Sequence, residues 1–408
     1  MGLIMMSFIV ELNMLSFKDR TQILAVEYAC FTLFYLISFL NFRMSFPVVI
    51  RVVFGFIIYL TALAYFSSDR VISYNYLAKF TFGLLSIVTG YNFFSRADDI
   101  KLLAKGAVIL LIVGLLISFF NNYVQSGKSL YNNEFYGPSL ATTYNTFALL
   151  VCLAISLSFF FSRREVIFTV FLSFLTVFLL LLVFKRSPIL IIMLATITTM
   201  MFSSRFKSRS LNVRRSIVLL IVILLATFPL YKDQIYENIS VRQDAFEARI
   251  EDQPRFRENV EVLTKISSSP LTLLFGSGEV FNSKGEAVQK ERMLHTDYAN
   301  ILWGGGVIGF VVYFGIFFYL LKRFIREKRR NLRNQTRNNI AFAGIIIVQS
   351  YLVCAISQAW TSISVMSIVM LSCGAVLGHI NMTLRKKTVP IRQTATPMDI
   401  KKTEGDGA

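Results

Sequence analysis

The sequence has few of the residues on which metal, redox and nucleotide chemistry usually depend. Four of its 408 residues are cysteine and two are histidine, and no cysteine stands in a CxxC pair. It contains no GxxxxGK(S/T) loop, no HExxH pair and no EF-hand loop. We therefore expect no cofactor and no metal. The four cysteines all fall inside apolar runs, where buried core thiols are the expected state.

Acidic residues are also scarce, with 24 Asp and Glu against 42 Lys and Arg and a net charge of +18. In a soluble chain this excess would suggest a nucleic-acid partner. Here the basic residues cluster in short connections between apolar runs, which is the pattern of cytoplasmic loops in membrane proteins. We expect contact with membrane lipid and no nucleic acid.

Apolar residues are abundant: they make up 55% of the chain, with 39 phenylalanines and a mean hydropathy of +0.59. Runs this long and apolar predict an all-α polytopic membrane protein with about twelve transmembrane helices. The predicted spans are Leu3–Phe17, Ile23–Phe42, Phe46–Phe66, Ile72–Phe94, Leu102–Phe120, Ser139–Phe161, Val166–Phe184, Pro188–Phe202, Ser216–Tyr231, Thr296–Leu321, Ile340–Ser357 and Ser362–Ile380. The first is short and lacks the basic region and cleavage site of a signal peptide.

The distribution of Lys and Arg predicts the orientation. The basic connections at 205–215 and 322–337 should be cytoplasmic, which places one long loop, residues 232–294, outside. The chain then divides into nine membrane helices (1–231), a partly helical periplasmic loop (232–294), three further membrane helices (295–384) and a polar cytoplasmic tail (385–408).

The outer loop contains a predicted amphipathic helix. Phe256, Val260, Leu263 and Ile266 recur at helical spacing, so their apolar stripe should face lipid or the helix bundle. The apolar run that follows ends in Gly276-Ser-Gly278, a turn that would let the backbone approach a neighbour closely.

Two arginines, Arg255 and Arg257, open this helix. A helix amino terminus with two guanidinium groups can hold phosphate oxygens bidentately. The alternative is a solvated face on which these arginines pair with Glu258 and Glu261.

The run from His295 to Gly309 begins with two titratable residues and continues into a glycine-rich predicted helix. His295 and Asp297 should lie at the outer membrane face, and Gly304, Gly305, Gly306 and Gly309 suit close helix packing in lipid. His295, Tyr298 and Leu302 share one side of a helix, so the imidazole and the phenol could face one cavity. The alternative is that His295 is an ordinary interfacial residue.

Arg186 is the other conspicuous cation. In Phe184-Lys-Arg-Ser-Pro188 two cations separate two apolar runs on the predicted outer side. Lysine and arginine are usually enriched in cytoplasmic loops, so cations are disfavoured there. We therefore interpret Arg186 as a candidate functional-site residue. The alternative is a side chain that snorkels to the headgroups.

Several of these runs resemble one family. The segments Arg255-Phe-Arg-Glu-Asn-Val, Ser269-Pro-Leu-Thr-Leu-Leu-Phe-Gly-Ser-Gly278, His295-Thr-Asp-Tyr and Gly306-Val-Ile-Gly309 resemble the signature of the O-antigen ligase and O-antigen polymerase family. Tyr136-Gly-Pro-Ser, Thr143-Tyr-Asn145 and Lys185-Arg-Ser187 are similar to its shorter outer-loop motifs. Thr296 stands where the family usually has asparagine, and Trp303-Gly304-Gly305 where it has an acidic residue before the glycines.

The resemblance implies about a dozen membrane helices and an active site on the periplasmic face of the bacterial inner membrane. It implies transfer of a glycan from an undecaprenyl-pyrophosphate carrier to an acceptor sugar, without nucleotide sugar or metal. Arg186 and Arg255 match the positions that bind the diphosphate leaving group, with Arg257 and Arg249 as further candidates. His295 matches the general base, for which Asp297 is the alternative, and Tyr298 is a candidate substrate contact.

The resemblance leaves two alternatives for the molecule that accepts the glycan. A polymerase transfers to another lipid-linked repeat unit, and a ligase transfers to lipid A-core. We prefer a polymerase because Thr296 replaces the asparagine expected after the histidine of a ligase; a chain-length regulator is then a candidate partner. A lipid or solute transporter is less favoured, because it should show half-helices, repeats or ionisable residues at mid-membrane, whereas these candidates gather at one face.

Overall fold

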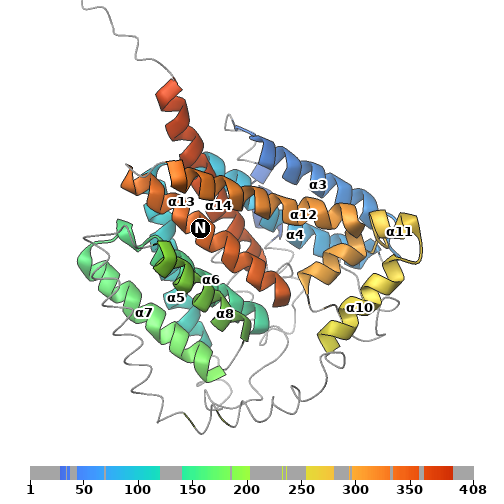
Figure 1. The fold of residues 1–408 in the computed structure, drawn as a ribbon, viewed down its shortest axis with the longest axis horizontal. Helices are drawn as coiled ribbons and strands as arrows, with labels where there is room; N and C mark the ends of the chain where they lie inside the picture. The colour runs from blue at the N-terminus through green and yellow to red at the C-terminus, as the bar shows by residue number, and fades with distance from the viewer. Residues whose placement is uncertain are drawn as a thin grey trace, which may run out of the picture.

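A computed structural model describes residues 28–33, 35–36, 44–68, 70–119, 140–183, 186–202, 232, 236, 254–279, 294, 296–330, 334–357 and 363–388 (Figure 1). Within these ranges the regular structure is helical and no strand occurs. The α-helices are α3 Val48–Ala64, α4 Arg70–Phe93, α5 Ala97–Phe119, α6 Leu140–Ser156, α7 Arg163–Val183, α8 Arg186–Phe202, α10 Pro254–Ile266, α11 Pro270–Phe275, α12 Asp297–Arg330, α13 Gln335–Cys354 and α14 Ile363–Thr388. Short 3-10 helices follow α6 (η3, Ser158–Phe160) and α13 (η6, Ala355–Ser357).

Four of the described helices are long and apolar enough to cross a membrane. They are α4, α12, α13 and the part of α14 from Ile363 to Met382. Val48–Ala64 and Tyr144–Ser156 are shorter apolar helices. This agrees with an all-α membrane protein, and the predicted spans between Phe46 and Phe202 each coincide with a helix. The predicted spans Leu3–Phe17 and Ser216–Tyr231 lie outside the described residues.

Three helices near the carboxyl end extend beyond their predicted apolar spans. α12 runs on to Arg330 rather than Leu321, α13 begins at Gln335 rather than Ile340, and α14 reaches Thr388 rather than Ile380. Most of the added residues are polar or charged. Hydropathy locates only the apolar part of a helix, whereas lysine and arginine are good helix formers that are favoured at a helix carboxyl terminus.

The centre of the bundle is α14, whose apolar segment is completely buried inside the protein. It packs against α4, α13 and α6. Glycines allow the close approach to α4: a Cβ added at Gly90 would overlap the Leu371 carbonyl, and one at Gly374 would overlap the Ile87 carbonyl. Small residues at a contact between apolar helices are the usual means of packing in lipid.

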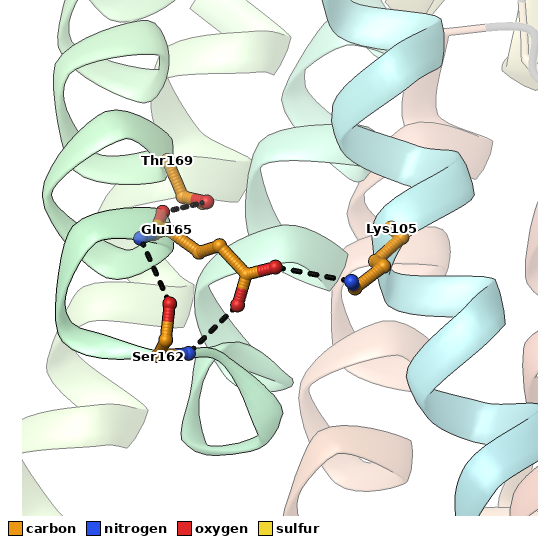
Figure 2. Close-up of polar contacts among 4 residues, drawn as sticks. All are labelled: Lys105, Ser162, Glu165 and Thr169. Atoms are coloured by element: carbon orange, nitrogen blue, oxygen red, sulfur yellow. Dashed lines mark hydrogen bonds and ion pairs between the residues drawn. The ribbon is translucent and has the colours of Figure 1, made fainter.

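α7 is fixed at its start by a capping box and an ion pair (Figure 2). The Ser162 backbone N–H donates to Glu165 Oε2 at 2.8 Å, and the Glu165 N–H donates to Ser162 Oγ at 3.4 Å. Lys105 of α5 lies 3.0 Å from Glu165 Oε1. The Ser162 N–H, followed by Lys105, lowers the pKa of the exposed Glu165 carboxyl from 4.5 to about 2. The carboxylate therefore connects α5 to α7.

The end of α12 and the start of α13 are joined by a buried ion pair. Glu327 and Arg337 are each 3% exposed and form a salt bridge, and Arg337 also donates to the Ile380 carbonyl of α14 at 3.5 Å. Nearby, His379 Nδ1 lies 3.0 Å from the Ser95 carbonyl oxygen. The His379 imidazole therefore links α14 to the residues between α4 and α5. All four cysteines were predicted to be buried thiols. Cys152, Cys354 and Cys373 are buried free thiols, whereas the free thiol Cys30 is partly exposed.

Candidate functional site

α12 is broken at Gly306. This residue has φ 60° and ψ −167°, which no residue of a continuous helix adopts. The predicted span Thr296–Leu321 coincides with part of α12, which is long and apolar enough to cross a membrane, but the helix is interrupted. A half-helix from Asp297 to Gly305 precedes the break, and the rest of α12 follows it. The sequence contained the signal, because three consecutive glycines lower the cost of leaving the helical conformation.

α11 and the turn that follows it fill the break. Gly276 has φ 80°, and a Cβ there would lie 2.6 Å from both the Gly304 carbonyl oxygen and the Gly306 nitrogen. A Cβ at Gly306 would in turn overlap the Gly276 nitrogen and the Leu274 carbonyl oxygen. The prediction that the Gly276-Ser-Gly278 turn lets the backbone approach a neighbour is confirmed: the neighbour is the glycine run of α12.

The backbone groups released by the break have protein partners. The Trp303 carbonyl oxygen accepts from the backbone N–H of Ser277 at 2.8 Å and from its hydroxyl at 3.0 Å. The Tyr59 hydroxyl of α3 donates to the Gly305 carbonyl at 2.7 Å. Irregular backbone at membrane depth requires such partners. Hydrogen bonds from α3 and from the turn after α11 therefore stabilise the break.

The amino terminus of α12 is tied to α10. Thr296 Oγ1 accepts from the Ala299 N–H at 3.1 Å, which caps the helix, and lies 3.3 Å from Asn259 Oδ1 of α10. Asn300 Nδ2 donates to the Leu294 carbonyl at 3.0 Å. The threonine that departs from the family pattern thus has a capping role in this chain.

The buried side of α10 differs from the predicted stripe. Val262 and Ile266 are buried against Leu294, Ala299 and Trp303. Ile266 of the predicted stripe is buried there, whereas Val260 and Leu263 are 44% and 53% exposed. The stripe was predicted to face lipid or the bundle. Helical spacing alone does not say which residues pack on protein, because α10 carries apolar residues on two sides.

Asp297 is completely buried in the first turn of α12. The Tyr351 hydroxyl of α13 donates to Asp297 Oδ2 at 3.3 Å, and the Tyr351 and Tyr313 hydroxyls are hydrogen-bonded to each other. A helix amino terminus favours a negative charge at this position. Neither tyrosine could be identified from the sequence, since Tyr313 and Tyr351 each stand in an apolar run and are 16 or more residues from Asp297.

Tyr298, the predicted substrate contact, makes interactions within the protein. Its hydroxyl donates to the Leu352 carbonyl of α13 at 3.0 Å. Its ring stacks on Phe314, with centroids 4.5 Å apart and an interplanar angle of 3°. Tyr298 thus joins the first half of α12 to its second half and to α13.

The other predicted site residues lie at or beyond the limits of the described part. Arg186 begins α8, and Arg255 and Arg257 lie in the first turn of α10; the structure describes their backbone and not their side chains. Arg249 and His295 lie outside the described residues. The structure therefore brings together three of the motif segments, at α10, at α11 with its turn, and at residues 294–306.

Glu279, which the sequence reading did not single out, lies beside this junction. Its Oε1 accepts from the Ser68 hydroxyl at 2.6 Å, and its backbone N–H donates to Ser277 Oγ at 3.1 Å. The side chain is 7% exposed and connects the turn after α11 to the α3–α4 connection. Within the described ranges no group of three His, Cys, Asp or Glu side chains could hold a metal ion.

No protein-family model matches the chain, and no curated protein matches it.

Proposed function

We propose that this chain is a glycosyltransferase of the bacterial inner membrane that polymerises undecaprenyl-pyrophosphate-linked repeat units of a surface polysaccharide such as O-antigen. The observation that carries the proposal is the convergence of three motif segments. α10 with its two arginines, the Gly276–Gly278 turn and the start of α12 are three separate segments between residues 254 and 306, and they pack into one unit. The same segments carry the resemblance to the O-antigen ligase and polymerase family.

The proposed reaction is a displacement at the anomeric carbon. The acceptor hydroxyl oxygen forms the new glycosidic bond, the bond from carbon to the diphosphate oxygen breaks, and the carrier leaves as undecaprenyl pyrophosphate. Arg186 and Arg255 stabilise the negative charge that develops on the diphosphate. Arg257 and Arg249 are the further candidates for this role.

His295 takes the proton of the acceptor hydroxyl. A neutral imidazole near physiological pH is suited to this step. The burial of Asp297 supports the choice, because a carboxylate with no exposed surface and a tyrosine hydroxyl on its Oδ2 is shielded from an acceptor sugar. Asp297 is then a buried structural charge at the start of α12 rather than the base.

Two alternatives differ in their products. A ligase would use the same residues to transfer the finished glycan to lipid A-core. A transporter is less favoured. Some transporters have a broken helix like α12, in which free backbone carbonyls bind the ion or substrate. Here the carbonyls of Trp303 and Gly305 instead accept hydrogen bonds from Ser277 and Tyr59.

The surface-polysaccharide profile of a deletion strain tests the proposal. Loss of a polymerase leaves single repeat units on lipid A-core, whereas loss of a ligase leaves polymer on the lipid carrier. Single-repeat products, restored to polymer by the wild-type gene, are the expected result. An unchanged profile would contradict both transferase functions.

A further inference from the structure

α10 has two exposed sides of opposite character. Beyond the side that packs on α12, Val260 and Leu263 form an exposed apolar side. Lys265 is exposed and Glu261 is partly exposed on the remaining, polar side. A helix with one side on the bundle, one apolar side and one polar side has the sequence character of a segment that lies in the plane of a membrane surface.

The exposed apolar side of α10 is followed by a more apolar helix. In α11, Leu271 is 70% exposed, and Leu273, Leu274 and Phe275 are exposed as well. Burying α11 residues of this kind is favourable in proportion to the area removed from water. The Gly276–Gly278 turn beside them packs closely on α12, so α11 has a fixed position with its apolar side chains exposed. This exposure indicates that an apolar environment outside the protein covers these side chains.

A distant part of the chain adds to the same face. At the end of α3, Phe66 is 74% exposed, and a Cβ on Gly278 would lie 3.4 Å from Phe66 Cβ, so Phe66 adjoins the turn after α11. The neighbouring Tyr65 is exposed, and the Arg70 guanidinium lies 4.6 Å from its ring centroid. Aromatic rings beside a cation are typical of the headgroup level of a bilayer.

This face is continuous with a helix that can span the membrane. Directly after the break that α11 fills, α12 exposes Val307, Val311 and Phe318, and α12 is one of the four helices long and apolar enough to cross a bilayer. The continuity favours lipid over a protein partner. We define the outer apolar surface as Val260, Leu263, Leu271, Leu274, Phe275 and Phe66.

We propose that the outer apolar surface is inserted in the bilayer at the boundary between headgroups and hydrocarbon. α10 and α11 are then an interfacial anchor and not a lid surrounded by water. The break at Gly306 lies at the membrane surface, and the half-helix from Asp297 to Gly305 lies at headgroup depth instead of crossing the hydrocarbon. This inference depends on membrane insertion and is independent of the proposed glycan transfer.

Spin labels on single cysteines of the full chain, reconstituted in phosphatidylethanolamine–phosphatidylglycerol vesicles, test the depth. A Cys30→Ser background keeps three buried thiols, Cys152, Cys354 and Cys373. Labels at Leu271→Cys and Leu263→Cys are compared with a lipid reference, Phe318→Cys, and a polar-side control, Lys265→Cys. Each label is relaxed by oxygen, which concentrates in lipid, and by a nickel chelate, which stays in water.

The expected result is stronger relaxation by oxygen than by nickel at Leu271 and Leu263, at a depth between the two reference positions, and the reverse at Lys265. Relaxation like that of Lys265 would show a water-exposed lid and overturn the proposal. Low accessibility to both reagents would show a protein partner, such as a second copy, and would overturn it equally. The readout uses no catalytic activity, so loss of glycan transfer would leave it unaffected.

Discussion

At the residue scale, the structure gives ion-pair partners to one buried and one exposed carboxylate, and it places the backbone of the proposed site's arginines. Glu327 and Arg337 satisfy each other inside the protein, and Glu165 has Lys105 and the Ser162 N–H. Arg186, Arg255 and Arg257 instead stand at the starts of helices, where an anion is favoured. The proposal that these arginines bind the diphosphate therefore rests on their helix positions and on the sequence motifs.

Replacing Arg186 or Arg255 by alanine should abolish polymer formation while the protein level is retained. Removing one preorganised donor to a developing charge typically lowers the rate about 10²-fold or more. Lysine should restore little activity, because an ammonium group cannot reproduce the two-pronged guanidinium contact. The measurement is the polysaccharide profile of each complemented strain, with Arg164→Ala, on the exposed start of α7, as the control. Wild-type polymer from the Arg186→Ala strain would remove Arg186 from the site.

Glu165 should make the stability of α7 depend on pH. Its folded pKa of about 2 lies below the ordinary 4.5, so its contribution is present above pH 4.5 and is lost as the pH falls toward 2. The melting temperature of Glu165→Gln in detergent should therefore be lower than that of the wild type at pH 7, and the difference should shrink at pH 3. A difference that stays constant with pH would contradict the role of the carboxylate charge.

At the scale of elements, helices were predictable and their breaks and faces were not. Phe46–Phe66 and Ile72–Phe94 were read from apolar length alone, and α3 and α4 follow them closely. Length does not show that Gly306 leaves the helix, because that depends on the docking of Gly276, thirty residues earlier. For the same reason Tyr351 could not be connected with Asp297. The periodicity of apolar residues predicts local structure, and it does not predict which distant elements are in contact.

Two glycines of α12 should respond in opposite ways to alanine. Gly306→Ala places a side chain at positive φ and against the backbone of Gly276, so it should destabilise the protein by about 1–3 kcal/mol or more. Gly315, in the regular part of α12, has open space around its Cβ position, and Gly315→Ala should stabilise the helix by about 0.5–1 kcal/mol. Thermal unfolding of the two variants in detergent measures the difference. Equal melting temperatures would contradict the break.

At the scale of the whole molecule, the proposed site requires one orientation in the membrane. The loop between Tyr231 and His295 must be periplasmic, and the turn between α12 and α13 must be cytoplasmic. The charge pattern predicts this, since basic residues gather at 205–215 and 322–337. The outward end of α12 would then hold Asp297 and the inward end the Glu327–Arg337 pair.

Reporter fusions at Ser283 and Asn334 should report opposite compartments, the first periplasmic and the second cytoplasmic. An alkaline-phosphatase fusion, active only outside, and a green-fluorescent-protein fusion, active only inside, give complementary readouts at each position. The same compartment at both positions would mean that α12 does not cross the membrane, and the assignment of His295 and Arg186 to the outer face would be lost.

The most direct test of the central claim is transfer by the purified protein. In vesicles that contain the undecaprenyl-pyrophosphate-linked repeat unit, and no nucleotide sugar, the wild type should produce lipid-linked products longer by whole repeat units and release undecaprenyl pyrophosphate. His295→Ala should reduce the rate on the order of 10²–10⁴-fold while still binding the donor, and Asp297→Asn should retain more activity than His295→Ala wherever it folds. A near wild-type rate for His295→Ala together with an inactive, folded Asp297→Asn would make the carboxylate the base. Absence of any elongation by folded wild-type protein would contradict the polymerase itself.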